Sequence, residues 1–281
     1  MPRPVTTAGI RVGRARLREA GVKDYQTITL DIENAIAVLR LNRPDRMNAL
    51  NTMMRAEITD ALRAAPGQGA RVLVITGNGT AFCSGQDLSD TGNAAAIDLE
   101  RVLRDEYVPM LRAIGDCPLP VIAAVNGPAA GAGANLALAT DVVIAAESAY
   151  FLQAFSRIGL MPDAGGTFWL PRQVGLAKAM GAALFAEPVS ARQADRWGMI
   201  WEAVPDPEFE AHWRARAMQL AEGPTRAHAN LKRAMRDGWD HGLEAQLDLE
   251  ARLQGACGQT RDFKEGVVAF HEKRPPKFEG R

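Results

Sequence analysis

The stretch PVIAAVNGPAAGAGANLALATDVVIAA, residues 120–146, decides the fold class of this 281-residue chain. It begins with an uncharged run at 120–125 that is typical of a buried strand, and it continues through a loop rich in glycine and alanine. Residues 131–140 have the small apolar side chains of a buried helix, and 141–145 are typical of a second strand. A strand, a helix and a strand in this order predict a βαβ unit with parallel strands.

The flanking segments extend this α/β pattern. Upstream, the sequence predicts paired strands, a helix, a third strand and a second helix at 27–32, 35–41, 51–65, 71–76 and 98–114. From residue 165 onward helical spacing dominates, with one short extended piece at 200–204. We therefore expect an N-terminal extension at 1–25, an α/β core at 26–204 and a helical region at 205–281. The arginine-rich start resembles a transit peptide only weakly.

Composition argues against several classes of protein. Lys and Arg number 33 and Asp and Glu number 33, so no general attraction to nucleic acid or anionic lipid is expected. Proline, glycine and asparagine interrupt the longest uncharged stretch, 118–140, which is therefore not expected to span a membrane. The three cysteines and four histidines show no disulfide or metal-binding spacing. We expect a cytoplasmic protein with reduced thiols and no metal.

Two glycine-containing loops follow predicted strands and lead towards helices, which is where open α/β sheets bind ligands. They read AFCSGQDL at 81–88 and VNGPAAGAGANL at 125–136. Glycine lets backbone approach a ligand, and two free N–H groups near a helix start would stabilise an oxygen anion. The alternative is that these glycines serve only tight turns and helix packing.

A third motif, FSRIGLMPDAGGT at 155–167, places Asp163 before a predicted helix. From residue chemistry alone, Asp163 is either a helix N-cap or a general acid and base. We expect Asp87, which can likewise cap a helix, and Asp141 to be structural.

Together with LNRP at 41–44 and NAL at 48–50, these motifs resemble the crotonase family, also called the enoyl-CoA hydratase/isomerase superfamily. The resemblance extends from about residue 26 to the C-terminus. It implies an α/β fold with a crotonase-like core of repeated ββα units, a helical C-terminal trimerisation region, and homotrimers or hexamers. It also implies an acyl-CoA substrate with no separate cofactor, and an enolate oxygen bound by the backbone N–H groups of Gln86 and Ala132.

The positions that decide the reaction depart from a family hydratase. Hydratases of the family activate water with two glutamates, and those positions fall here on Asn135 and Phe155, neither of which is a base at neutral pH. Asp163 is the acid that remains near the expected pocket. Four segments most resemble the isomerases of phenylacetate degradation: 155–167, 197–201, 247–250 and 265–270. In those enzymes an aspartate at the Asp163 position is the acid and base.

The resemblance therefore implies an acyl-CoA isomerase. It would convert ring-1,2-epoxyphenylacetyl-CoA to the oxepin-CoA, shift an enoyl-CoA double bond, or do both. The alternatives are an enoyl-CoA hydratase and a non-catalytic, CoA-binding homologue. A hydratase of the same pathway is a further expected partner.

Six residues are expected to contact the substrate: Arg46, Gly85, Gly131, Asn135, Phe155 and Lys264. Arg46 and Lys264, together with Arg43 and Lys273, would meet the CoA phosphates unless they are ordinary solvated side chains. Phe155 would face a benzenoid acyl group unless it packs in the core.

Overall fold

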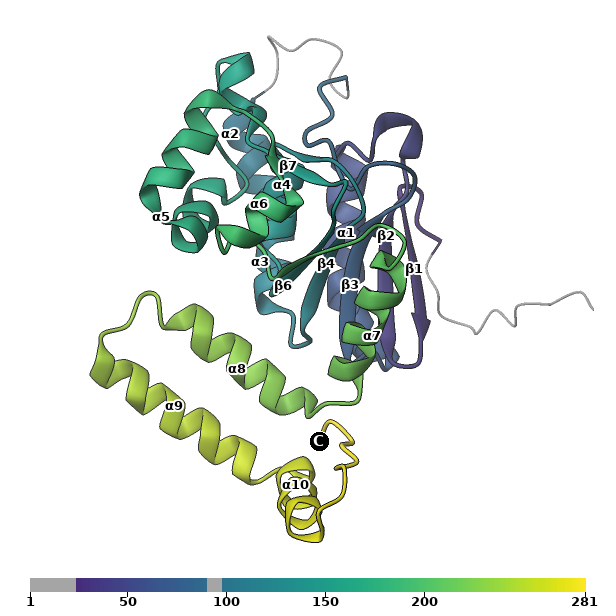
Figure 1. Ribbon diagram of the computed structural model, residues 1–281, viewed down its shortest axis with the longest axis vertical. Coiled ribbons are helices and arrows are strands. Elements are labelled where there is room, and N and C mark those ends of the chain that lie inside the picture. The colour runs from purple at the N-terminus through teal and green to yellow at the C-terminus, as the bar shows by residue number, and fades with distance from the viewer. Residues whose placement is uncertain (1–23, 90–97) are drawn as a thin grey trace, which may run out of the picture.

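The computed structural model describes residues 24–89 and 98–281, and it is built around one mixed sheet (Figure 1). The strand order is β1-β2-β3-β4-β6-β9. Strand β1 runs antiparallel to β2, and the remaining neighbours are parallel. The bounds are β1 Ile28–Glu33, β2 Ile36–Leu41, β3 Val72–Gly77, β4 Val121–Val125, β6 Val142–Ala146 and β9 Glu202–Val204.

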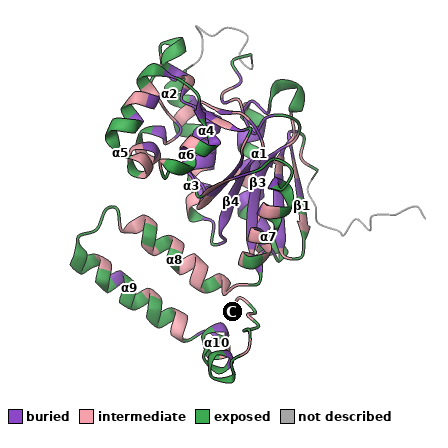
Figure 2. Cartoon of the chain, viewed as in Figure 1, coloured by how far each residue is buried: buried purple, intermediate pink, exposed green. Residues whose placement is uncertain are grey.

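Alternate side chains of these strands enter two separate hydrophobic cores, because successive residues of a strand point to opposite faces. On one face, Val72, Val74, Ile122, Ala124 and Ile144 pack in a core with Phe209 and Trp213 of α7 (Phe209–Ala221). On the other, Leu73, Ile75, Val121, Ala123 and Val125 share a core with the helices α1 (Thr52–Ala64), α3 (Val108–Asp116) and α4 (Ala132–Leu138). Figure 2 shows the sheet as the most buried part of the molecule.

The helices on that second face lie in the connections between the strands. Helix α1 (Thr52–Ala64) begins where the side chain of Asn51 accepts a hydrogen bond from the N–H of Met54. Helix α2 (Leu99–Val102) continues through a π-helical turn, Leu103–Tyr107, into α3 (Val108–Asp116). Helix α4 (Ala132–Leu138) connects the small strand β5 (Ala129–Ala130) to β6.

A second, three-stranded sheet in the order β5-β7-β8 lies beside the first. It contains β7 (Tyr150–Leu152) and β8 (Val189–Ser190). Helix α5 (Gly166–Phe185) lies between these strands in sequence and is interrupted at Gly175, which has φ 77°. Helix α6 (Ala191–Arg196) follows β8, and the side chain of Ser190 caps it by accepting a hydrogen bond from the Gln193 N–H.

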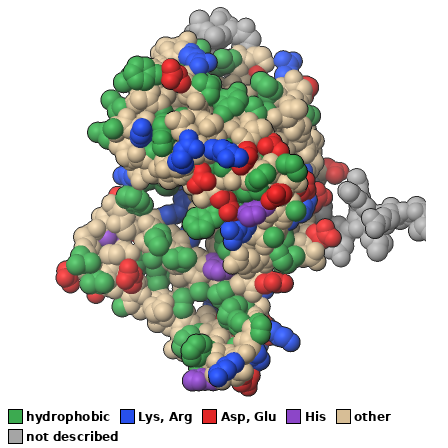
Figure 3. Space-filling view, in the orientation of Figure 1, with side chains coloured by type: hydrophobic (Ala, Val, Ile, Leu, Met, Phe, Trp, Pro, Cys, Tyr) green, Lys and Arg blue, Asp and Glu red, His purple; other side chains and the backbone are tan. Residues whose placement is uncertain are grey.

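Three further helices form an arm below the core in Figure 1: α8 (Thr225–Asp237), α9 (Leu243–Gly258) and α10 (Arg261–Glu272). A largely apolar, open groove of about 1230 Å³ runs between the helices of the arm. Exposed apolar side chains gather on it, including Leu231, Met235, Leu247, Phe263 and Phe270 (Figure 3). Helix α7, which the sequence places after the core, instead packs on the sheet, so the layered core extends past residue 204.

Arg71, just before β3, connects this core to the arm. Its guanidinium donates hydrogen bonds to the Phe278 carbonyl oxygen at 3.1 Å, to Thr225 Oγ1 at 2.9 Å and to the Gly223 carbonyl oxygen. The chain's last residues are thereby held beside the core. Within residues 24–89 and 98–281, no helix is both long and apolar enough to cross a lipid bilayer.

Candidate active site

The two glycine-containing loops lie in direct contact. The Ala130 N–H donates a hydrogen bond of 2.9 Å to the Cys83 carbonyl oxygen, and Cys83 forms a β-bridge with Ala129. A Cβ atom on Gly133 would lie 2.3 Å from the Cys83 carbonyl oxygen, so glycine is required for this approach. The two loops, each of which the sequence places after a strand, are therefore in backbone contact.

Contact between the loops brings two free N–H groups close together. Ala132 is the first residue of α4 and follows Gly131, which has φ 52°. A Cβ atom on Gly85 would lie 3.4 Å from the Ala132 nitrogen and 2.8 Å from the Ala130 carbonyl oxygen. In the described part of the chain, the N–H groups of Gln86 and Ala132 have no hydrogen-bond acceptor. Both are available to an oxygen anion.

Asp163 lies in the turn between β7 and α5, and its side chain is half-buried, with the Oδ1 atom buried. Burial raises the pKa of Asp163 to about 6, and a hydrogen bond from its own backbone N–H offsets only part of this increase. Among the described residues, the buried atom Oδ1 has no hydrogen-bond partner. A carboxyl group with a pKa near 6 exchanges protons readily at neutral pH.

The N-cap role considered for Asp163 is wrong. Helix α5 begins at Gly166, its N-cap position is Gly165, and no side chain bonds to that helix start. Ala164 (φ 46°) and Gly165 (φ 80°) form a left-handed turn between Asp163 and the helix. The carboxyl group is therefore free for another role.

Asn135 is completely buried and bonded to the protein rather than turned to a substrate. Its Nδ2 donates a hydrogen bond of 2.8 Å to the Asp163 carbonyl oxygen, and its Oδ1 accepts one of 2.8 Å from Gln153 Nε2. Phe155 is 7% exposed, and its ring reaches to 3.8 Å from where a Cβ on Gly131 would lie. The two hydratase positions thus hold a structural amide and an apolar wall.

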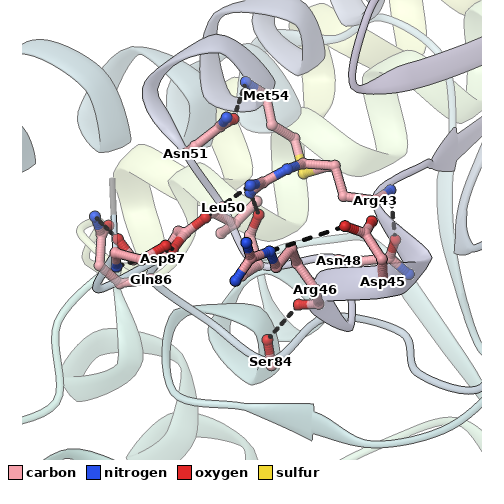
Figure 4. Close-up of polar contacts among 12 residues, drawn as sticks. Arg43, Asp45, Arg46, Asn48, Leu50, Asn51, Met54, Ser84, Gln86 and Asp87 are labelled. Atoms are coloured by element: carbon pink, nitrogen blue, oxygen red, sulfur yellow. Dashed lines mark hydrogen bonds and ion pairs between the residues drawn. The ribbon is translucent and has the colours of Figure 1, made fainter. Parts of the chain in front are cut away.

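Arg46 and Arg43, two of the basic residues proposed for CoA, differ in their surroundings. Arg46, on the 3-10 turn Pro44–Arg46, is exposed, and its carbonyl oxygen accepts a hydrogen bond of 3.4 Å from Ser84 Oγ, next to Gly85 (Figure 4). Arg43 is instead bound by the protein, with an ion pair to Asp87 at 2.8 Å and a hydrogen bond to the Ala49 carbonyl oxygen at 2.6 Å.

Lys264 and Lys273 lie on and just after α10, in the arm. Figure 1 shows α10 at the opposite end of the molecule from α4. Within one chain, the structure does not bring either lysine to Asp163. The direction in which the arm leaves the core decides this, and no local sequence pattern encodes that direction.

Asp87 and Asp141 are structural, as expected. Asp87 pairs with Arg43 and accepts hydrogen bonds from the backbone and hydroxyl of Ser89. Asp141 pairs with Lys232 at 2.8 Å and Arg236 at 2.9 Å and so attaches α8 to the core.

Sequence reasoning missed a buried polar cluster behind Gln86, made of Arg55, Glu106 and Tyr107. Arg55 is 1% exposed although it is an arginine. The available signal was its position on α1, since Arg55, Ile58 and Leu62 share one helix face at spacings of three and four. A charge on an apolar helix face requires a buried partner.

The described ranges contain no group of three or more histidine, cysteine, aspartate or glutamate side chains placed to bind a metal. The site described here consists of two backbone donors, one carboxyl group and an aromatic wall.

Comparison with known proteins identifies the family. The enoyl-CoA hydratase/isomerase family model matches residues 31–281. A Rhodobacter capsulatus protein named "Probable enoyl-CoA hydratase" is 65% identical, covering 92% of this chain and 99% of its own. The 1,2-epoxyphenylacetyl-CoA isomerase of Escherichia coli is 44% identical, covering 89% and 97%.

A solved structure agrees with these sequence matches. An enoyl-CoA hydratase from Polaromonas sp. JS666 superposes with a TM-score of 0.85 at 31% identity, covering 90% of this chain and 99% of the other. The resemblance stated from the sequence and the predicted crotonase fold are both confirmed. This chain belongs to the enoyl-CoA hydratase/isomerase family.

Proposed function

We propose that this chain is an acyl-CoA isomerase that works through a thioester enolate, with Asp163 as its acid and base. The observation that carries the proposal is the single carboxyl group of the site. Asp163 has a pKa of about 6 and an unpartnered Oδ1 among the described residues, whereas the two positions that bear glutamate in family hydratases hold Asn135 and Phe155.

The proposed reaction uses one movable proton. The Asp163 carboxylate removes a proton from the carbon next to the thioester, and the electron pair moves onto the thioester oxygen. The N–H groups of Gln86 and Ala132 donate to that oxygen, where each donor supplies roughly 3–4 kcal/mol in comparable sites. Asp163 then returns the proton to a carbon farther along the conjugated system. With the ring epoxide, the ring carbon–carbon bond that the epoxide oxygen bridges also breaks, and the seven-membered oxepin forms. The product is an isomer of the substrate, and no water is added.

The proposal also includes the identity of the acyl group. Support for a ring-1,2-epoxyphenylacetyl group comes from the Escherichia coli relative named as an isomerase of that ester. The buried ring of Phe155 beside Gly131 suits a cyclic acyl group, because aromatic and apolar surfaces pack well against it. A double-bond shift in a linear enoyl-CoA uses the same proton transfer.

A second candidate is an enoyl-CoA hydratase, which the name of the Rhodobacter relative favours. Hydration requires a positioned water molecule as well as a proton donor, and two carboxylates share these roles in the hydratases of the family. Asp163 alone would have to do both. We therefore place this candidate second.

Three substrates separate these candidates. Purified protein is incubated with ring-1,2-epoxyphenylacetyl-CoA, 3-hexenoyl-CoA and crotonyl-CoA, and the products are identified by chromatography with mass detection. We expect isomers of unchanged mass from at least one of the first two, and very slow hydration of crotonyl-CoA. Hydration of crotonyl-CoA as fast as any isomerisation would contradict the proposal.

We also propose that the chain assembles as a homotrimer or hexamer through the arm. The support is the apolar surface on α8, α9 and α10, which a single chain leaves exposed. Sedimentation of the purified protein measures the assembly state directly.

A further inference from the structure

The side chain of Gln86 is held by two hydrogen bonds from the core. Its Oε1 accepts one of 2.6 Å from the Tyr107 hydroxyl and one of 2.9 Å from Arg55 Nη1. The guanidinium of Arg55 lies over the Tyr107 ring, 4.8 Å from its centroid. We call Arg55, Gln86, Glu106 and Tyr107 the Gln86 cluster.

In the Gln86 cluster Arg55 and Tyr107 are buried, Gln86 and Glu106 are half-buried, and the charge of Glu106 balances that of Arg55. Arg55 Nη2 pairs with Glu106 Oε2 at 2.6 Å, and the Arg55 side chain is 1% exposed. Burial alone would raise the pKa of Glu106, but the hydrogen bond and charge of Arg55 lower it overall. Burial raises the pKa of Tyr107 well above its usual range, so the phenol stays protonated and donates.

Packing alone does not explain this cluster. Arg55 occupies the apolar face of α1, where a leucine or methionine would pack without the desolvation of a charge. Replacing a buried ion pair by apolar residues is often neutral or stabilising. The bonds that Arg55 makes outside the ion pair therefore indicate what it contributes.

Those bonds converge on the backbone around Gln86. Leu50 donates its N–H to the Gly85 carbonyl oxygen at 2.7 Å and accepts from the Asp87 N–H at 3.1 Å. Arg55 Nη1 donates to the same Leu50 carbonyl oxygen at 2.7 Å. Because the bonding groups of an extended strand alternate in direction, the Gln86 N–H points away from Leu50, towards the side on which Ala132 lies.

We propose that Arg55 and Tyr107 are positioning residues that fix the direction of the Gln86 N–H in the oxyanion hole. Arg55 holds Leu50, the strand partner of Gln86. Arg55 and Tyr107 together hold the Gln86 side chain. The peptide group between Gly85 and Gln86 then has one orientation. This inference rests on the proposed function, because it takes the Gln86 N–H as a donor to the thioester oxygen.

The test removes hydrogen bonds of the Gln86 side chain and keeps side-chain shape. Tyr107→Phe deletes one donor, Gln86→Met deletes the acceptor, and the double variant closes a thermodynamic cycle. Tyr25→Phe is the matched control, because the Tyr25 hydroxyl also donates to a side chain, Asp60 Oδ2 at 2.7 Å, away from the site. For each variant we measure kcat, KM, the melting temperature and the infrared carbonyl band of bound [1-¹³C]butyryl-CoA.

We expect Tyr107→Phe to lower kcat about tenfold or more while KM changes less than about twofold, because a small misplacement of a catalytic group acts mainly on the transition state. The carbonyl band should shift back towards that of the free ester. In the Gln86→Met background Tyr107→Phe should add little, and Tyr25→Phe should leave kcat and the band unchanged.

Three results would overturn the inference. The first is an unchanged kcat and carbonyl band in Tyr107→Phe. The second is an equal loss of kcat from Tyr107→Phe in the wild-type and Gln86→Met backgrounds, which would mean that Tyr107 acts on the substrate directly. The third is an effect of Tyr25→Phe on kcat and the carbonyl band as large as that of Tyr107→Phe. If Tyr107→Phe does not fold, Gln86→Met decides alone by the same two readouts. Failure of the proposed isomerase activity is seen separately, because the carbonyl band of the wild-type complex needs no turnover.

Discussion

The side-chain amide of Asn135 holds the backbone of Asp163, through a hydrogen bond of 2.8 Å from Nδ2 to the Asp163 carbonyl oxygen. Asn135 belongs to α4, the helix whose first N–H is one of the two free donors. One short helix therefore sets the position of both the proposed anion-binding group and the proposed acid. Asn135, which the family resemblance places at a hydratase glutamate position, here supports the backbone of Asp163.

Asn135→Ala tests this support. It removes the donor to Asp163 and leaves Gln153 Nε2 without its acceptor, so the free energy of unfolding should fall by about 1–3 kcal/mol. The turn that carries Asp163 loosens, and kcat should fall more than KM rises. Ser190→Ala, which removes the N-cap of α6, is the control: it should cost about 1 kcal/mol and leave kcat unchanged. Equal effects of both variants on kcat would refute the supporting role.

Asp163→Asn should lower isomerase kcat at least about a hundredfold, because an amide cannot transfer the proton. Binding of a non-reactive acyl-CoA, measured by calorimetry, should stay close to that of the wild type. Turnover within a few-fold of wild type would mean that another group moves the proton.

The pH dependence of kcat follows from the pKa of Asp163. The carboxylate is the active form, so kcat should rise about tenfold per pH unit below pH 6 and level off above it. A profile measured from pH 4.5 to 8.5 checks this. A flat profile across pH 6 would exclude Asp163 as the rate-determining base.

The carboxyl group of Asp163 also makes the free energy of unfolding depend on pH. Its pKa is about 6 in the folded protein and about 3.9 in an unfolded chain, so the folded state binds the proton more tightly. The contribution of this tighter proton binding to the free energy of unfolding is complete below about pH 4 and is lost as the pH rises through 6. With allowance for screening by solvent, Asp163→Asn should be about 1–2 kcal/mol more stable than wild type at pH 8 and equal to it near pH 4. Denaturant melts at both pH values measure the difference.

Ala132→Pro deletes one anion-hole donor without changing the neighbouring side chains. Proline is well tolerated at the first position of a helix, which is the position of Ala132 in α4. The loss of one such donor should lower kcat about 10²–10³-fold. Leu243→Pro is the matched control, because Leu243 is the first residue of α9 and follows an extended residue, Gly242. If the folded Ala132→Pro variant still binds acyl-CoA and turns over normally, Ala132 is not a donor.

The sequence predicted the βαβ unit at 120–146 well, and β4, α4 and β6 confirm it. The strands and the helix of this unit are long enough to give a recognisable sequence pattern, whereas β5 has only two residues and gives none. The π-helical turn at Leu103–Tyr107 was likewise merged into one expected helix. The resemblance of the loop motifs to the family implied Gln86, Ala132 and Asp163 as site residues, and the structure brings the two loops that carry Gln86 and Ala132 into contact.

The residues that sequence reasoning missed depend on contacts between distant segments. Arg55 and Glu106 are separated by 51 positions, and only the packing of α1 against the following helix brings them together. The left-handed turn at Ala164 and Gly165, which separates Asp163 from α5, is also not evident from composition. Single residues with chemistry in a loop were predictable, but the partners that hold them were not.

The backbone contact between Gly133 and Cys83 affects how much of the substrate's binding free energy is used to arrange the protein before catalysis. Because the described loops 81–88 and 125–136 already touch at the backbone, they need not be brought together before the thioester oxygen meets its proposed donors. The dipoles of these two loops need little reorganisation when charge develops on that oxygen, and no binding free energy is consumed by bringing the two loops into contact. What remains is available to select the acyl group.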